Sequence, residues 1–94
     1  MNRLEGGTIM SFKKFNKVIV NEVEHIGDGQ FSRISNDIII DAGENSITDI
    51  FIKMIRNTTI IKHIHFKGEN TDSSFAGNFV VKDIRGNSIN LQKI

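Results

Sequence analysis

The amino-acid sequence predicts an α+β fold. We expect a small antiparallel sheet of order β-β-β-α-β-β-β, with one amphipathic helix packed on one face of the sheet. The first observation is length, because 94 residues provide one hydrophobic core and no second domain. The second is the recurrence of short runs rich in Ile and Val between turn-forming Gly, Asn and Ser. The third is a stretch near the middle of the chain whose apolar residues have helical spacing.

Three strands are expected before the helix. Residues 15–26 are rich in β-branched side chains in partial alternation with polar ones, which predicts the first strand. A tight turn is expected at residues 27–29, Gly-Asp-Gly, because glycine adopts positive φ without steric cost. Residues 30–34 then form a short second strand. After another turn, the run of three Ile within residues 37–41 predicts a buried third strand.

Residues 46–56 are predicted to form the helix. Ser46 and Asp49 have the spacing of a capping box, with Asp in place of the usual Glu. Five apolar residues follow the pattern i, i+3, i+4, i+7, i+8, namely Ile47, Ile50, Phe51, Met54 and Ile55. A stripe of this kind is typical of a helix with one buried face.

Three strands are also expected after the helix. Residues 58–67 are rich in Thr and Ile and predict a strand, and the polar residues 68–74 predict a loop. Residues 79–84 and 88–91 are apolar strands on either side of Arg-Gly-Asn at 85–87. Gly and Asn both accept positive φ, so this segment predicts a hairpin.

A short β-solenoid is the alternative architecture. Asn16, Asn36, Asn57 and Asn78 lie 20 or 21 residues apart, and each precedes an apolar pair of residues. A repeat of this length with an asparagine ladder suits the coils of a parallel β-helix. The predicted helix interrupts the second coil, which favours the sheet.

Composition excludes several kinds of chemistry. The chain has 12 basic and 11 acidic residues, and a net charge of +1 gives no sign of a polyanionic partner. The absence of cysteine excludes disulfides, thiolate metal sites and cysteine nucleophiles. No apolar run reaches the length of a signal peptide or of a membrane span. We therefore expect a cytoplasmic protein with no membrane partner.

The start of the chain and the codon usage suggest an origin. In AT-rich codons, Glu5-Gly6-Gly7 reads as a purine run resembling a bacterial ribosome-binding site, just upstream of Met10. We therefore interpret residues 1–9 as a wrongly assigned leader and residues 10–94 as a single globular domain. N-terminal mass spectrometry of the native protein tests this. The 17 Ile, 10 Asn and 8 Lys also favour a low-GC bacterium, or a phage or mobile element living in one.

His63 and His65 are the candidate metal ligands. They share one face of a strand, because side chains alternate with period two, and imidazole is a common metal ligand. With Glu69 four residues on, the segment resembles the first half of the cupin metal motif, His-x-His-x3-Glu, which implies a metal site in a β-rich fold. The second half of that motif is absent. His25 is a further histidine that could approach from the first strand.

Residues 84–89, Ile-Arg-Gly-Asn-Ser-Ile, resemble the Sm2 signature of Sm and Sm-like RNA-binding proteins. In that family the Arg and Gly line an RNA base pocket, so the resemblance implies such a role for Arg85 and Gly86. No Sm1 motif precedes the segment, and the 38 residues after the helix are too few for the five strands of that barrel. Arg85 and Asn87 at this hairpin tip are candidate binding residues in any case.

A basic arm near the N-terminus is a second candidate nucleic-acid site. Lys13, Lys14 and Lys17 are interleaved with Phe12 and Phe15, a pattern that suits phosphate contacts and base stacking. The alternative is a solvated terminus whose two phenylalanines pack onto the sheet. Because the net charge is only +1, this hypothesis requires an oligomer that multiplies the arm and the hairpin arginine.

The leading functional hypothesis is a small non-enzymatic binding protein that acts through protein–protein contacts or self-association. No nucleophile elbow, dinucleotide loop or P-loop occurs, so no enzyme activity and no cofactor are expected.

Open sheet edges would suit strand addition by a partner. The face around His63, His65 and Lys67 is a candidate contact surface. The origin hints suit an accessory protein of a phage or mobile element that inhibits a host factor. The alternatives are an oligomeric RNA-binding module and a metal-binding β domain.

Overall fold

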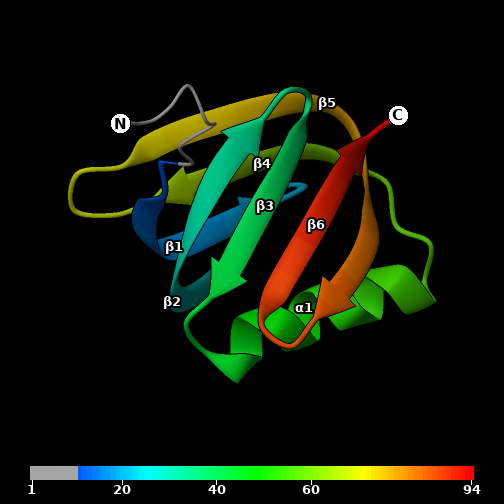
Figure 1. The fold of residues 1–94 in the computed structure, drawn as a ribbon, viewed down its shortest axis with the longest axis horizontal. Coiled ribbons are helices and arrows are strands. Elements are labelled where there is room, and N and C mark those ends of the chain that lie inside the picture. The colour runs from blue at the N-terminus through cyan, green and yellow to red at the C-terminus, as the bar shows by residue number, and fades with distance from the viewer. Residues whose placement is uncertain (1–10) are drawn as a thin grey trace, which may run out of the picture.

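The computed structural model describes residues 11–94, which form a closed antiparallel barrel with one helix (Figure 1). Around the barrel the strands follow the order β1-β2-β3-β6-β5-β4. The elements along the chain are β1 (Lys13–Val20), β2 (Val23–Ile34), β3 (Asp37–Ala42), α1 (Asn45–Arg56), β4 (Ile61–Lys67), β5 (Asp72–Arg85) and β6 (Ser88–Lys93).

The barrel closes because two three-stranded meanders pair at both sides. β1 pairs with β4 from Lys17↔Lys67 to Val20↔Ile64, and β3 pairs with β6 from Ile38↔Leu91 to Asp41↔Ser88. The predicted order of elements is confirmed, but the predicted open sheet with a helix on one face is wrong. The same alternation of buried and exposed residues serves an open sheet and a barrel, since a barrel also buries one face of each strand.

The solenoid alternative is also wrong. Every pair of neighbouring strands is antiparallel, whereas the coils of a β-helix stack in parallel. The recurring Asn residues lie in different kinds of structural element. Asn16 lies within β1, Asn36 in the β2–β3 turn, Asn57 at the end of α1, and Asn78 within β5.

The first turn lies earlier than predicted. β1 ends at Val20 and β2 begins at Val23, so the turn is made by Asn21 and Glu22, with φ of 48° and 71°. The predicted turn at residues 27–29 is wrong, because these residues lie inside the 12-residue strand β2. Two consecutive left-handed residues make a tight hairpin turn without any glycine.

Helix α1 closes one end of the barrel, where it contacts β2, β3 and β5 (Figure 1). Its buried residues Ile47 and Phe51 are fully inaccessible to solvent. Gly27 of β2 makes this approach possible, because a Cβ there would lie 2.7 Å from the Ile47 side chain. The predicted helix is confirmed within one residue, but the capping box is not formed. The N-cap is Glu44, which makes no side-chain capping hydrogen bond, and Ser46 lies inside the helix.

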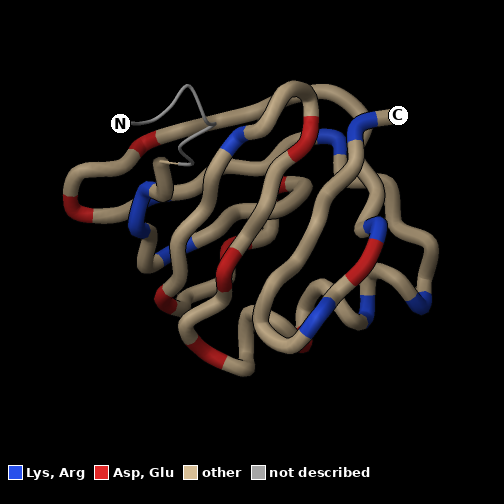
Figure 2. Tube along the Cα trace, in the orientation of Figure 1, with Lys and Arg blue, Asp and Glu red and all other residues tan. Residues whose placement is uncertain are grey.

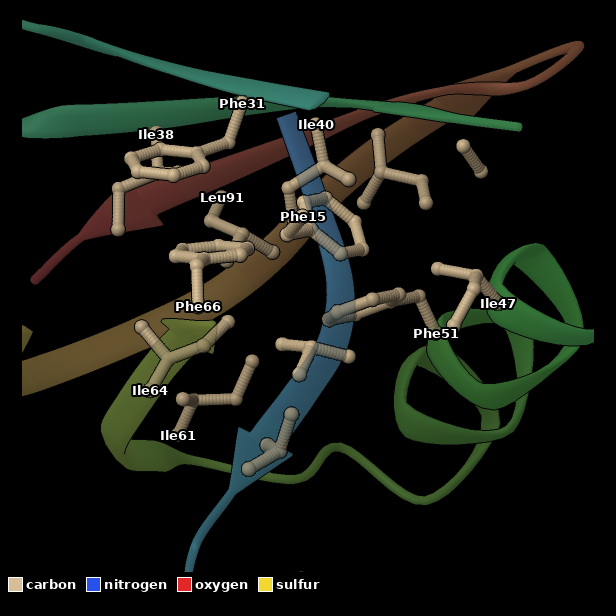
Figure 3. Close-up of a cluster of buried hydrophobic side chains, with 14 of the residues drawn as sticks. Phe15, Phe31, Ile38, Ile40, Ile47, Phe51, Ile61, Ile64, Phe66 and Leu91 are labelled. Atoms are coloured by element: carbon tan, nitrogen blue, oxygen red, sulfur yellow. The ribbon is translucent and has the colours of Figure 1, made fainter. Parts of the chain in front are cut away.

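The core fills the barrel from end to end (Figure 3). Phe66 lies toward the end away from the helix, where its ring stacks on Phe31 with centroids 4.0 Å apart and an interplanar angle of 11°. Phe15 packs against the same ring at 5.2 Å. Aromatic contacts between β1, β2 and β4 therefore hold this part of the core together.

The second half of the chain departs from expectation mainly in β5. This strand has 14 residues and starts at Asp72, so three of the seven residues of the predicted loop at 68–74 belong to the strand. β4 starts at Ile61, three residues later than predicted. The hairpin between β5 and β6 is confirmed. Gly86 has φ of 60° as the first residue of the two-residue turn, a position that favours glycine.

The predicted leader, residues 1–9, lies outside the described residues. Within residues 11–94, no helix has both the length and the apolar character that crossing a membrane requires.

Candidate functional site

The end of the barrel opposite α1 carries a groove of about 640 Å³, which we call the mouth groove. It lies between the second half of β2, the first half of β5 and the start of β1. Figure 1 shows the β2–β3 hairpin and the first half of β5 at this end, away from the helix. Barrel mouths of this volume are common places for ligand sites.

The groove exists because β2 and β5 extend beyond their neighbours. β5 pairs with β4 from Asp72 to Phe79, but with β6 only from Phe79 onward. β2 pairs with β1 only as far as Phe31↔Lys13, while its pairing with β3 continues to Ile34. Each of the two long strands thus has a segment with a ladder on one edge only, and the groove lies between these segments.

An arginine and an aromatic ring lie together in the mouth groove. The Arg33 guanidinium carbon is 4.9 Å from the centroid of the Phe75 ring, a cation–π distance. Phe75 is half-buried, and its ring meets the Phe31 ring edge to face, with centroids 5.9 Å apart. The core thus supports one side of the Phe75 ring, and the arginine covers another part of it.

Positive charge and hydroxyl groups dominate the rest of the lining. Lys13 and Arg33 are both exposed, and neither forms an ion pair within the described residues. No acidic side chain is among the described residues that line the groove. Its five serines are Ser11, Ser32, Ser35, Ser73 and Ser74, although the Ser74 hydroxyl contacts His63 Nε2 instead of facing the groove. This lining can hold an anion by charge and by hydrogen bonds from hydroxyl groups.

Two further hollows adjoin the start of β1. The first, of about 560 Å³, is lined by Phe12, Lys13, Lys14, Asn70, Thr71 and Glu69, and we call it the lysine hollow. The second, of about 540 Å³, includes Lys14, Asp28, Asp41 and Glu69, and we call it the acidic hollow. Phe15 is a buried core residue with 3% of its surface exposed, so this ring packs onto the sheet and does not stack on bases.

The predicted metal ligands lie on the outer face of β4. His63 Nε2 is 2.6 Å from the Ser74 hydroxyl, and His65 Nε2 contacts the Asp72 carboxylate. The two ring centroids are 6.3 Å apart. Among residues 11–94, no three His, Asp or Glu side chains lie close enough together to hold a metal ion. A metal on these Nε2 atoms would have to displace both side-chain contacts.

The other two residues considered for the metal site, His25 and Glu69, lie elsewhere. His25 pairs with Val18, whose side chain is in the core, while His65 pairs with the next residue of β1, Ile19. Paired residues share a face and successive residues alternate, so His25 lies on the opposite face of the barrel wall from His65. Partial burial lowers the pKa of His25. Glu69 is an exposed loop residue in the two hollows beside β1.

The contact between His65 and Asp72 predicts a pH dependence. The hydrogen bond from His65, followed by the charges of His65 and Lys67, lowers the pKa of the Asp72 carboxyl below its ordinary value. A carboxyl with a lowered pKa in the folded state stabilises the fold above its unfolded pKa, and this contribution disappears as the pH falls below about 4. We expect Asp72→Asn to lose less stability than the wild type between pH 5 and pH 3, as measured by urea unfolding. Asp49→Asn, an exposed control on α1, should follow the wild type; equal pH profiles for all three proteins would contradict the assignment.

The remaining predicted residues fall into two separate places. Lys17 and Lys67 face each other on β1 and β4, and Lys17 Nζ is 3.6 Å from Glu24. Arg85 is exposed beside the β5–β6 turn, and the Asn87 carbonyl in that turn accepts a hydrogen bond from the Ala42 amide. This turn lies at the helix end of the barrel, so a single copy does not bring Arg85 together with Lys13 and Lys14. Figure 2 shows basic and acidic residues interspersed along the described trace.

Sequence reasoning missed Arg33, Phe75 and the serines of the mouth groove. Arg33 and Phe75 are 42 residues apart in the chain, and neither belongs to a recognisable motif. Lys13 was found because it stands in a basic cluster. Comparison of the chain with family models, curated proteins and solved structures finds no match. The geometry of the site is therefore the basis for any functional proposal.

Proposed function

We propose that this protein is a non-enzymatic binding domain that takes an anionic ligand with a flat ring, such as a nucleoside phosphate, into the mouth groove. The observation that carries the proposal is the lining itself: two cations, a half-buried aromatic ring and several serines, with no acidic side chain among the described lining residues. This lining modifies the sequence-based expectation, which placed a protein partner first.

The chemistry of the lining fits the two parts of such a ligand. Arg33 offers a planar guanidinium that can bind a phosphate with two parallel hydrogen bonds, and Lys13 adds a second positive charge. The ring of Phe75 and the plane of Arg33 offer stacking surfaces to a base. Arg33 and Phe75 are part of the strands, and Phe31 of the core packs against the Phe75 ring, so the ring needs little ordering on binding.

The test is a matched pair of arginine variants. We expect Arg33→Ala to weaken the binding of adenosine monophosphate about tenfold, because a hydrogen bond to a charged group contributes about 1.5–3 kcal/mol. Arg85→Ala removes another exposed arginine, at the other end of the barrel, and should leave the affinity unchanged. Calorimetric titration measures both. Amide chemical shifts should change at residues 31–35 and 73–75 and not in α1.

Two results would overturn the proposal. One is an equal loss of affinity in both arginine variants, which would indicate general charge attraction. The other is a set of chemical-shift changes outside the mouth groove.

Strand addition by a protein partner is the second candidate function. It is favoured by one observation: residues 72–77 of β5 pair only with β4 among the described residues, which leaves their other edge without a ladder. Such an edge can accept an additional strand, including one from a second copy. Size-exclusion chromatography with light scattering detects self-association, and hydrogen exchange would then show new protection at residues 73–77. A monomer whose amides there stay unprotected when a cell extract is added would count against this candidate.

A further inference from the structure

The mouth groove is the first of three hollows that follow one another around the start of β1. It shares Lys13 with the lysine hollow, and the lysine hollow shares Lys14 and Glu69 with the acidic hollow. Lys13 and Lys14 thus stand at the two junctions. A ligand that reached from the mouth groove into the lysine hollow would pass Lys13 and then meet Lys14.

The charge of the lining changes sign along this path. The mouth groove has Lys13 and Arg33 and no acidic residue among its described lining. The lysine hollow has two lysines and Glu69, and the acidic hollow has Lys14 against Asp28, Asp41 and Glu69. The Asp41 carboxylate also accepts a hydrogen bond from Gln30 Nε2 at 3.1 Å. A polyanion would therefore be attracted to the first two hollows and repelled by the third.

Aromatic rings accompany the first two hollows. The mouth groove has Phe75, and the lysine hollow has Phe12, a half-buried ring next to the two lysines. Proteins bind single-stranded nucleic acids with alternating cations and aromatic rings, because positive charge attracts the phosphates and the rings stack on the unpaired bases. A mononucleotide would leave the lysine hollow unused.

We propose that the ligand is a short single-stranded nucleic acid that occupies the mouth groove and the lysine hollow and ends before the acidic hollow. This inference rests on the proposed function and names its ligand class. One base stacks at Arg33 and Phe75, the backbone passes Lys13 and Lys14, and a further base reaches Phe12. The acidic hollow limits the length of strand that is bound.

Fluorescence anisotropy with thymidylates of increasing length tests the inference. Affinity should rise about tenfold or more from thymidine monophosphate to tetrathymidylate, since stacking of each additional base contributes about 1–3 kcal/mol. It should rise little from tetrathymidylate to octathymidylate, because the acidic hollow blocks the path. The affinity for tetrathymidylate should also fall steeply between low and moderate salt.

A matched pair of lysine variants locates the strand. Lys14→Glu should weaken the affinity for tetrathymidylate about tenfold. It should change the affinity for thymidine monophosphate less than about twofold, because Lys14 lies outside the mouth groove. Lys53→Glu, an exposed lysine on α1, makes the same charge change at the other end of the barrel and should have no effect. Both variants must unfold at the same temperature as the wild type, which shows that their folds are intact.

The outcomes separate this inference from the proposed function. Equal affinity for mononucleotide and tetranucleotide, or equal loss in both lysine variants, would overturn the single-strand inference and leave the mouth groove as a small-ligand site. No binding of either probe would overturn both. Tighter binding of an acidic peptide such as octaglutamate than of tetrathymidylate would also overturn the inference, since it would make the partner a protein.

Discussion

Phe66→Ala is expected to lower the free energy of unfolding by about 3–5 kcal/mol, the largest effect of any substitution that we consider. Phe66 is fully buried and stacks on Phe31 at 4.0 Å, with Phe15 and Phe75 at 5.2 and 6.3 Å. These four rings come from four different strands. Truncation removes the buried area of the ring and leaves a cavity that these neighbours cannot fill without moving the barrel wall.

Urea unfolding followed by circular dichroism measures the change. A loss of this size is a large part of the stability of a domain of this length, which lies in the range of about 5–15 kcal/mol. Phe66→Leu keeps most of the volume and should cost less than about 2 kcal/mol. A loss below about 1 kcal/mol for the alanine variant would mean that the ring does not pack in the core as described.

Asn21→Ala is expected to destabilise the fold by about 2–3 kcal/mol, although the residue is exposed. Its side-chain amide donates a hydrogen bond to the Ile60 carbonyl at 3.0 Å. Its Oδ1 accepts from the Lys62 amide at 2.7 Å and from the His63 amide at 3.3 Å. These bonds join the β1–β2 turn to the start of β4, where the barrel closes. Asparagine also tolerates the left-handed φ of 48° better than alanine does.

Two control variants separate the causes of this loss. Asn21→Gly relieves the backbone strain but lacks the side chain, so its urea midpoint should lie between those of the alanine variant and the wild type. Asn21→Asp keeps the acceptor oxygen and loses only the donation to Ile60. Alanine and glycine variants that both unfold within about 0.5 kcal/mol of the wild type would show that the side chain contributes no more than a surface substitution does.

Local features of the chain were predictable from sequence. Helix α1 follows from an apolar stripe with helical period, and the β5–β6 hairpin follows from a glycine at a position that needs positive φ. The Ile run of β3 follows from its β propensity. Each of these signals lies within a few residues of the element that it predicts.

The β1–β2 turn shows where local signals fail. The glycines at 27 and 29 are the stronger turn formers, yet they lie within a strand. A Cβ at Gly27 would meet the Ile47 side chain, and a Cβ at Gly29 would lie 2.6 Å from the Phe15 ring. Their role is to let other residues approach the backbone closely. The turn is made by Asn21 and Glu22, and the conformation of Asn21 is stabilised by hydrogen bonds to residues about forty positions away.

The sequence by itself determined the number and order of the elements, the helix with its apolar stripe and the basic cluster at the start of β1. Only the tertiary structure decided that the strands close into a barrel, that α1 covers one end, and that Arg33 and Phe75 meet in a groove at the other. The physical reason is that periodicity and turn propensity report which face of a segment is buried. Strand pairing and site assembly depend instead on contacts between residues far apart in the chain.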